Sequence, residues 1–465
     1  MDKIATLNSE RQRLSEASSG IRKVISAVLD ADSFVETGAF ATGKAFDVAT
    51  DGEGVVTGFG TVQGFPVYLI AQNSEVLGGS LGKAHAEKML KVIEMAKKAG
   101  APLISIVDSK GARLSEGVTV LESYAKVLAA VSNLSEIPHI CILKGVACGL
   151  MANYVSLCDF VIAAEECVMS AGMPMTVMSK ANLLSKPSEA LGGKFHSEKS
   201  GLIDFTYKTD AELSETLTKL ISLIPFSTDC IAECENGDDL NRISANLNEK
   251  VCPTCLIEAI ADDGEYLELA SQFATEVKCA LATINGVTTA IVATDAKGAK
   301  LSVNGVYKMA KFIAKADYLN MPLLTLVNSD IIDTDIRQET YALSMTSGLI
   351  AEVASYAHPK IAVIYGNSVG FSYSVLSSKG IGFDYVLAFA NAAVAPILPE
   401  SAPNILYVDE LLGAGDVEAK RAELVSKYEE YMADPMLAAR EGYIDDVIEP
   451  AHVRPYVVNA FQMLK

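Results

Sequence analysis

Ala101-Pro102-Leu103-Ile104-Ser105-Ile106-Val107-Asp108 is an apolar run of β-type residues that ends in a carboxylate. A matching run, Met321-Pro322-Leu323-Leu324-Thr325-Leu326-Val327-Asn328, lies 220 positions later, since 322 − 102 = 220. Each run follows a helical pattern that contains two lysines and a methionine, at residues 88–91 and 308–311. Both features recur at one offset, which indicates an internal duplication.

The duplication extends beyond these runs. Downstream, the β-type run at 137–142 leads to Gly149, and the run at 358–364 leads to Gly370. Upstream, two segments have the pattern of a β-hairpin, residues 57–64 and 279–286. Short apolar runs alternate with longer helical patterns in each copy. This alternation predicts βα units with largely parallel strands, and so an α/β fold.

The boundary between the copies is predicted in an acidic segment. Glu235-Asn236-Gly237-Asp238-Asp239 has the composition of a linker. We therefore expect two tandem α/β domains, 1–240 and 241–465. Near the end of the chain, residues 408–431 have the pattern of one charged amphipathic helix, and Asp434-Pro435 starts another.

The composition describes an acidic globular protein. Half of the 465 residues are apolar and 21% are charged, which allows large cores. The formal net charge of −20 repels nucleic-acid phosphates, so we expect no nucleic-acid partner. The N-terminus lacks the apolar segment of a secretory signal, and residues 137–164 read as strand, turn and helix rather than a membrane span. We expect a soluble, cytoplasmic protein.

Nine cysteines fall into two groups. Five lie in apolar surroundings, where cysteine behaves as a small buried hydrophobe: Cys141, Cys148, Cys158, Cys167 and Cys279. The spacing of the other four approaches that of a zinc site without matching it fully: Cys230, Cys234, Cys252 and Cys255. Reduced thiols around the linker are the simpler interpretation. We therefore expect no metal and keep zinc as the minor alternative.

The sequence offers little for nucleophilic catalysis. It has five histidines and no Gly-x-Ser-x-Gly elbow, and the glycines at 78–83 lack the spacing of a P-loop. A stronger signal is the glycine turn between a strand and a helix at residues 144–152. Backbone N–H groups at a helix start can stabilise an oxyanion, although a packing turn is the commoner explanation for one such turn. The recurrence of the turn at 367–372 favours the oxyanion interpretation.

A second candidate is the polar loop at residues 108–117, which directly follows a β-type run. Ligand sites of α/β folds lie at the carboxyl ends of parallel strands. The alternative is a plain capped loop in which Arg113 and Glu116 form a solvated ion pair.

Several segments, taken in order, resemble the carboxyltransferase subunits of biotin-dependent acyl-CoA carboxylases and decarboxylases. This family includes the propionyl-CoA carboxylase beta chain and the alpha chains of methylmalonyl-CoA and glutaconyl-CoA decarboxylases. The segments are residues 51–60, Gly78-Gly79-Ser80-Leu81-Gly82, the loop at 108–118, Leu191-Gly192-Gly193, residues 262–268 and residues 441–450. The resemblance extends from about residue 20 to the end of the chain.

The resemblance implies two tandem crotonase-type (ClpP/crotonase-like) domains. The first would bind a CoA thioester, and the second would bind biotin carried on a biotin carboxyl carrier protein. A biotin carboxylase or membrane decarboxylase subunits would be further partners. The chain itself would form a dimer or hexamer with its sites at subunit interfaces. Such a carboxyltransferase works in either direction and needs neither a metal nor a covalent nucleophile.

The resemblance also assigns site residues by position. The acyl oxyanion would be held by the backbone N–H groups of Gly149 and Leu150. The biotin oxygen would be held by those of Phe371 and Ser372, beside Gly370. Residues expected along the CoA are Gly78, Gly79, Gly82, Gly111, Ala112 and Arg113.

The chain departs from the family pattern at four places. Leu150 stands where a second glycine is usual, Phe371 where a small residue is usual, and Lys110 replaces another glycine. The acidic loop at 328–335 replaces a loop rich in proline and glycine. These changes leave open a non-catalytic structural or assembly paralogue. A further alternative is a hydratase or thioesterase that uses the first domain alone, with Glu116 as its acid or base.

Overall fold

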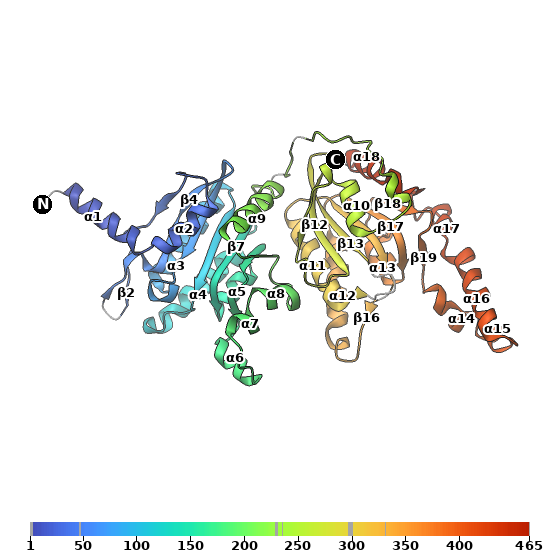
Figure 1. Cartoon of the computed structure of the whole chain (residues 1–465), viewed down its shortest axis with the longest axis horizontal. Coiled ribbons are helices and arrows are strands. Elements are labelled where there is room, and N and C mark those ends of the chain that lie inside the picture. The colour runs from blue at the N-terminus through green and yellow to red at the C-terminus, as the bar shows by residue number, and fades with distance from the viewer. Residues whose placement is uncertain are drawn as a thin grey trace. The chain divides into compact units, whose positions relative to one another are not determined.

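Two compact units make up the chain. The computed structural model describes residues 3–45, 48–227, 231–234, 236–295, 301–330 and 332–464. The first unit is Met1–Cys230 and the second is Ile231–Lys465 (Figure 1). This division precedes the expected one at 240/241 because the start of the second unit pairs with that unit's own sheet. Ala232 O accepts the Thr288 N–H at 2.9 Å, and Cys234 N–H donates to Gly286 O at 2.7 Å.

The first unit is built on one mixed sheet with the order β1-β4-β5-β6-β7-β8-β10, and β9 pairs with β7 outside this path. The pairs β1–β4 and β4–β5 are antiparallel, and the other pairs are parallel. The strands are β1 (Val35–Thr37), β4 (Val55–Val62), β5 (Phe65–Gln72), β6 (Leu103–Ser109), β7 (His139–Cys148), β8 (Phe160–Ala164), β9 (Val168–Ser170) and β10 (Phe205–Tyr207). A separate short pair joins β2 (Lys44–Ala45) and β3 (Val48–Ala49).

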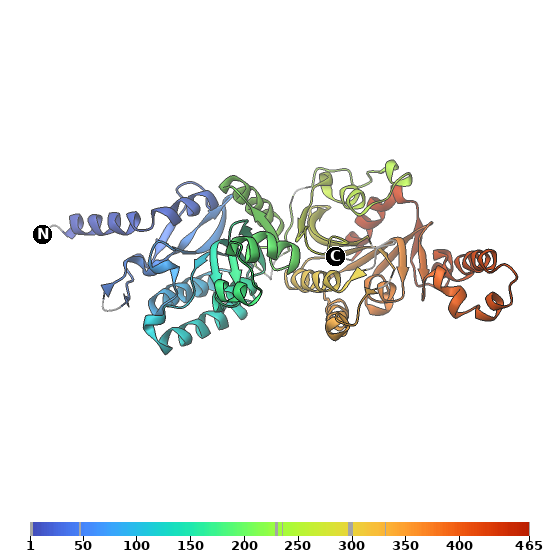
Figure 2. The same cartoon turned by 60° about the horizontal axis from the view of Figure 1, so that its bottom comes forward.

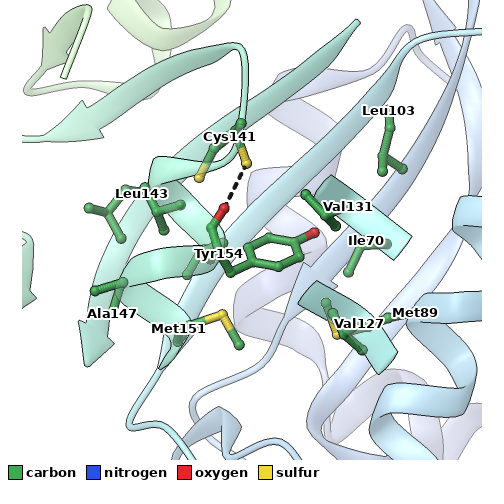
Figure 3. Close-up of a cluster of buried hydrophobic side chains, with 14 of the residues drawn as sticks. Ile70, Met89, Leu103, Val127, Val131, Cys141, Leu143, Ala147, Met151 and Tyr154 are labelled. Atoms are coloured by element: carbon green, nitrogen blue, oxygen red, sulfur yellow. Dashed lines mark hydrogen bonds between the residues drawn. The ribbon is translucent and has the colours of Figure 1, made fainter. Parts of the chain in front are cut away.

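Helices pack against this sheet through apolar side chains. One core joins β5, β6 and β7 to α3 (Lys83–Ala99), α4 (Val118–Ser132) and α5 (Leu150–Ser156). Figure 3 shows Met151 and Tyr154 of α5 in this core, beside Val127 and Ile70. Two further helices pack against each other, α2 (Ser19–Val28) and α9 (Asp210–Leu223). The remaining helices are α1 (Lys3–Glu16), α6 (Pro174–Lys180), α7 (Pro187–Leu191) and α8 (Gly193–Lys199).

The second unit repeats the same sheet. Its order is β11-β12-β13-β15-β17-β18-β20, and β19 pairs with β17 outside this path. Again the first two pairs are antiparallel and the others are parallel. The strands are β11 (Leu267–Leu269), β12 (Val277–Ile284), β13 (Val287–Thr294), β15 (Leu323–Ser329), β17 (Lys360–Val369), β18 (Tyr385–Phe389), β19 (Ala393–Ala395) and β20 (Asp446–Ile448). A separate pair joins β14 (Leu301–Ser302) and β16 (Ile332–Asp333).

The second unit also has helices around its sheet (Figure 2). The core contains α10 (Pro253–Ile260) and α18 (Val453–Met463), and α11 (Val303–Tyr318) packs against α12 (Glu339–Ser355). The other helices are α13 (Phe371–Leu376), α14 (Ala402–Ile405), α15 (Val408–Leu412), α16 (Val417–Tyr428) and α17 (Pro435–Arg440).

The prediction of a single helix over residues 408–431 is wrong. The chain leaves the helix after Leu412 and starts a new one at Val417, because Asp416 caps it by accepting the Ala419 N–H at 3.1 Å. The predicted start at Asp434-Pro435 is confirmed, since Asp434 caps α17 in the same way.

The predicted duplication is confirmed, and each unit has a buried lysine at the matching position. Lys88 Nζ in α3 donates to the carbonyl oxygens of Gly52 and Val55. Lys308 Nζ in α11, at the matching position, donates to the carbonyl oxygens of Phe273 at 2.8 Å and Val277 at 2.7 Å. A buried ammonium group requires such acceptors. The hairpins predicted at 57–64 and 279–286 are confirmed as β4–β5 and β12–β13.

Among the described residues, no helix has both the length and the apolar character that a bilayer crossing requires.

Candidate functional site

Asp108 fixes the chain where β6 ends. Its Oδ1 accepts the Val146 N–H at 3.1 Å, and its Oδ2 accepts the Ser74 hydroxyl at 2.6 Å. Position 145 must be glycine, because a Cβ there would lie 2.1 Å from Asp108 Oδ1. The carboxylate therefore holds β7 in the shifted register that follows Val107.

Asn328 has the same role at the end of β15. Its Oδ1 accepts the Asn367 N–H at 2.9 Å, and a Cβ at Gly366 would lie 2.3 Å from that oxygen. Its Nδ2 donates to Asp295 Oδ1 at 3.2 Å. Asp330, in the acidic loop, accepts from Asn367 Nδ2 at 2.6 Å. Part of the acidic loop thus holds the turn that follows β17.

The predicted glycine loops of the first unit lie against one another. Lys110 N–H donates to Gly78 O at 3.0 Å, and Leu81 N–H donates to Gly111 O at 2.9 Å. A Cβ at Gly79 would lie 2.2 Å from the backbone oxygen of Asp108. Only glycine permits so close an approach of two loops.

The same loop reaches the turn after β7. A Cβ at Gly111 would lie 3.4 Å from the carbonyl oxygen of Cys148, and Gly111 has a φ of 102°. Ala112 forms a short parallel bridge with Leu81. The structure therefore brings the loops at 78–82 and 108–113 together with the glycine turn at Gly149.

The side chain of Arg113, which was expected along the CoA, is buried among acceptors of its own chain. Its side chain is 4% exposed, and its Nη1 lies 2.5 Å from Glu53 Oε2 and 3.2 Å from Glu116 Oε1. Its Nη2 donates to Ser80 O at 3.0 Å. A buried guanidinium group needs these acceptors to offset its lost hydration. Arg113 therefore positions the loops and does not form the solvated pair of the alternative interpretation.

Glu116 is also used within the loop. Its Oε2 accepts the Lys83 N–H at 2.6 Å, at the start of α3, and its Oε1 pairs with Arg113. A Cβ at Gly82 would lie 2.2 Å from Glu116 Oε1, which explains this glycine. With both oxygens engaged, Glu116 is poorly placed to serve as the acid or base of a hydratase or thioesterase.

The two expected donors at the turn after β7, Gly149 and Leu150, differ in their hydrogen bonding. Gly149 has φ 62° and ψ −131°, a conformation that favours glycine. Its N–H donates to Ser170 O at 2.9 Å and is therefore already engaged within the chain. Leu150 is the first residue of α5, and its N–H has no acceptor in the described chain. Leu150 thus holds the same position at the start of α5 as Phe371 holds at the start of α13.

The turn after β17 has the same form. Gly370 has a φ of 53°, and its N–H donates to Ala395 O at 3.0 Å. Phe371 and Ser372 begin α13, and their N–H groups meet no acceptor among the residues that the structure describes. Ser372 Oγ is buried and has no partner there either.

A groove of about 530 Å³ opens beside this second turn. Phe371 is not among the described residues that line it, so the bulky side chain does not fill it. The lining consists of Gly370, Tyr373, Ser374, Val394, Ala395, Pro396, Tyr431, Met432, Asp434, Leu437, Ala438, Glu441 and Tyr443. Most of these side chains are apolar or aromatic, and Asp434 and Glu441 add two carboxylates to the lining.

The buried side chain of His85, near the turn after β7, was not expected from the sequence. His85 Nδ1 in α3 is 2.9 Å from Glu53 O, and its Nε2 is 3.4 Å from Gln72 Nε2. Burial lowers the pKa of His85 to about 3, so the ring is neutral near pH 7. Gln72 Nε2 in turn lies 3.8 Å from Met151 Sδ, in α5. The available signal in the sequence was the Asp-Gly-Glu-Gly segment at 51–54. It forms a turn in which Glu53 is buried, and the carbonyl oxygen of Glu53 contacts His85.

The zinc alternative is wrong for two of its four cysteines. A disulfide joins Cys252 and Cys255, so neither thiolate is free to bind a metal. Cys234 is an exposed free thiol, and Cys230 lies outside the described residues. In the described part of the chain, no group of three or more His, Cys, Asp or Glu side chains is arranged to hold a metal.

Known proteins share the whole of this architecture. Residues 12–465 match the carboxyl transferase domain. The chain belongs to the carboxyl transferase family. The propionyl-CoA carboxylase beta chain of Saccharopolyspora erythraea is 32% identical over 474 residues, which cover 95% of this chain and 87% of that protein. The methylmalonyl-CoA carboxyltransferase 12S subunit of Propionibacterium freudenreichii subsp. shermanii is 30% identical over 488 residues, or 98% and 93% of the two chains.

Solved structures of carboxyl transferases have the same fold. A crystal structure of the transcarboxylase 12S hexamer with methylmalonyl-coenzyme A and methylmalonic acid bound has a TM-score of 0.93 and 28% identity, and the match covers 99% of this chain and 94% of that one. A single-chain long-chain acyl-CoA carboxylase matches with a TM-score of 0.81 at 18% identity, over 100% of this chain and 50% of its own. The tandem crotonase-type α/β fold is therefore confirmed. The chain is a carboxyltransferase, and the non-catalytic alternative is not favoured.

Proposed function

We propose that this carboxyl transferase moves a carboxyl group between biotin, carried on a partner protein, and the α-carbon of an acyl-CoA. The acyl-CoA binds the first unit and biotin binds the second. One observation carries the proposal, the duplicated turn. In both units a glycine at positive φ ends a long strand and begins a short helix, whose first N–H group has no acceptor in the described chain.

The turn of the first unit supports enolate chemistry. Gain or loss of a carboxyl group at the α-carbon of a thioester places negative charge on the thioester oxygen. A fixed N–H aimed at that oxygen lowers the barrier. Leu150 N–H is one such donor. Ala112 N–H is the second, since it also lacks an acceptor in the described chain and its loop lies against the carbonyl of Cys148.

A lysine compensates for the acidic surface near the CoA. The chain carries a net charge of −20, so a polyanionic ligand needs a local cation. Lys110 is exposed, and its side chain lies over the loop at 78–82, since a Cβ at Gly78 would lie 2.9 Å from Lys110 Cδ. The residue that departs from the family pattern therefore becomes a contact for the CoA phosphates.

The groove beside Gly370 suits the ring system of biotin. Its walls are largely apolar, and the turn that lines it bears the N–H groups of Phe371 and Ser372. Biotin, when its carrier delivers it there, supplies or accepts the carboxyl group. The two N–H groups would serve as hydrogen-bond donors to the oxygen of the biotin ring, where they could stabilise developing negative charge. Tyr373 and Tyr431 line the groove and would offer aromatic surface to the ring system.

Relatives direct the choice of acyl group. One relative is named as a propionyl-CoA carboxylase beta chain, and another, 31% identical over 463 residues, as the methylmalonyl-CoA decarboxylase subunit alpha of Propionigenium modestum. Propionyl-CoA and methylmalonyl-CoA are therefore the substrates that we propose.

Transfer to free biocytin tests the proposal. Purified protein is mixed with methylmalonyl-CoA and biocytin, and the conversion to propionyl-CoA is followed by chromatography. Calorimetric titrations with acetyl-, propionyl-, methylmalonyl- and glutaconyl-CoA run in parallel. Conversion that depends on biocytin supports the proposal. Binding of acyl-CoA without any response to biocytin would contradict the assignment of the second unit, and no binding at all would contradict both.

A further inference from the structure

A Cys-Pro-Thr-Cys sequence opens α10, in the second unit. Cys252 is the N-cap residue, Pro253 is the first residue of the helix, and Cys255 is the third. A disulfide joins Cys252 and Cys255. Carboxyl transfer uses neither sulfur, so this pair requires its own explanation.

Stability of the fold does not explain the disulfide. The bond spans a sequence separation of three, and a loop this short gains little from the loss of chain entropy. The helix is instead anchored by its apolar face, because Leu256, Ile257 and Ile260 lie in the core of the second unit. Arg454 also donates to the carbonyl oxygen of Ile260.

The position of Cys252 favours a reactive thiolate. Its Sγ accepts the backbone N–H of Cys255 at 3.1 Å, at the positive end of the helix. Helix N-termini and Cys-x-x-Cys motifs lower thiol pKa values and so increase the fraction of nucleophilic thiolate. Both cysteines are partly exposed, and Cys255 packs against the core. Cys252 is therefore the attacking sulfur and Cys255 the resolving one.

The pair lies away from the proposed carboxyl-transfer site. The chain after α10 leads to Asp262, whose carboxylate accepts the N–H groups of Asn285 and Gly286 at the turn between β12 and β13. Thr294, at the opposite end of β13, accepts the N–H of Asn328 at the site. The full length of β13 therefore lies between the end that is linked to α10 and the end at the proposed carboxyl-transfer site.

We propose that Cys252 and Cys255 form a reversible dithiol–disulfide site that exchanges with low-molecular-weight thiols. In oxidation, the Cys252 thiolate attacks one sulfur of a small disulfide RSSR, which breaks the S–S bond and releases one thiolate. The Cys255 thiolate then attacks the Cys252 sulfur of the mixed disulfide and releases the second. Two protein thiols are oxidised and RSSR is reduced to two RSH. Excess thiol reverses both steps.

Redox titration of the full chain tests this site. The protein is equilibrated with graded mixtures of reduced and oxidised glutathione, quenched in acid and alkylated. After digestion, the mass of the peptide that contains residues 252–255 is measured by mass spectrometry. We expect the peptide to pass from dithiol to disulfide as the ratio changes, and to return when reduced glutathione is restored. Cys234→Ser, which removes an exposed free thiol, is the matched control and should leave the titration unchanged.

Single substitutions test the two roles. Cys255→Ser should accumulate a glutathione mixed disulfide on Cys252, and its thiol should be alkylated about tenfold faster than the remaining thiol of Cys252→Ser. A peptide that stays in one redox state at every ratio would overturn the proposal. So would equal alkylation rates in the two variants, or a tightly bound zinc ion that protects these cysteines until a chelator removes it.

Discussion

Arg113 and Glu53 form an ion pair that is closed to solvent. Their side chains are 4% and 0% exposed, and the closest nitrogen and oxygen are 2.5 Å apart. Such a pair adds little net stability over apolar side chains, but removal of one partner leaves a buried charge without compensation. Because Arg113 also donates to Ser80 O, loss of the pair would loosen the loop at 78–82 as well.

Arg113→Met should therefore lower the free energy of unfolding by about 3–5 kcal/mol, through the unpaired Glu53 carboxylate. Arg13→Met is the control, since Arg13 is 57% exposed in a surface ion pair, and it should cost no more than about 1 kcal/mol. Urea denaturation of both variants measures the difference. Equal losses would show that the Glu53 site is open to water.

Buried histidines make the first unit sensitive to acid. Burial lowers the pKa of His139 to about 3, while an unfolded histidine titrates near 6.5. Between these values the unfolded state binds a proton that the folded state does not, so stability is complete above pH 6.5 and is lost as the pH falls toward 3. His139→Gln should flatten the decline by about 1.4 kcal/mol per pH unit. Chemical denaturation at pH 8, 6 and 5 measures this, and a variant that keeps the wild-type slope would contradict the assignment.

At the scale of elements, each site depends on a strand that ends in a tight turn. Asp108 and Asn328 accept the N–H of the residue after a glycine in β7 and β17, respectively. The hydrogen bonds shift the register of these strands and aim the following turn at the start of α5 or α13. The glycines at 145 and 366 are a consequence, because any side chain would displace the acceptor oxygen.

Gly366→Ala should destabilise the protein by about 1–3 kcal/mol, because the new Cβ would lie 2.3 Å from Asn328 Oδ1 and displace that side chain. Gly348→Ala is the matched control in α12, where a Cβ meets no atom within 4 Å. It should stabilise the helix by about 0.5–1 kcal/mol. Thermal unfolding separates the two variants, and a shift of the same sign in both would contradict the packing at Asn328.

The sequence predicted the strands, the duplication and the glycine turns, because these depend on local pattern and spacing. It did not predict that the Gly149 N–H is occupied, because its acceptor Ser170 belongs to a three-residue strand whose pairing with β7 leaves no local signal. Nor did it find the partner of Arg113, which lies 60 positions earlier, since 113 − 53 = 60. Contacts between distant loops decide which of the predicted residues can touch a ligand.

At the scale of the whole molecule, both units expose apolar side chains that a monomer would leave in water. In the first unit, Leu184 is 100% exposed and Met173 is 73% exposed, both near α6. In the second unit, Leu412 is 80% exposed and Tyr431 is 65% exposed. Apolar surface of this kind marks protein interfaces. The exposed residues favour assembly of several copies, as in the hexamer of transcarboxylase 12S.

Light scattering coupled to chromatography should therefore give a mass that is a multiple of 49.3 kDa, either a dimer or a hexamer. Leu184→Asp places a charge on one of the exposed patches and should shift the distribution toward smaller species. Ser185→Asp, at the adjacent exposed polar position, introduces the same single negative charge and serves as the control. A wild-type protein that remains monomeric at micromolar concentration would contradict this expectation.

We propose that backbone N–H groups at the two duplicated turns stabilise the charge that develops during carboxyl transfer, and proline substitution can remove these donors one at a time. Proline is tolerated at the first position of a helix but has no N–H, so Leu150→Pro and Phe371→Pro remove one donor each while keeping the fold. Each proline substitution should lower kcat for the methylmalonyl-CoA and biocytin reaction by about 10²–10³-fold. Leu150→Ala and Phe371→Ala, which keep the donor, should retain most of the activity. Proline variants that fold and remain as active as their alanine controls would show that these N–H groups do not assist the carboxyl transfer.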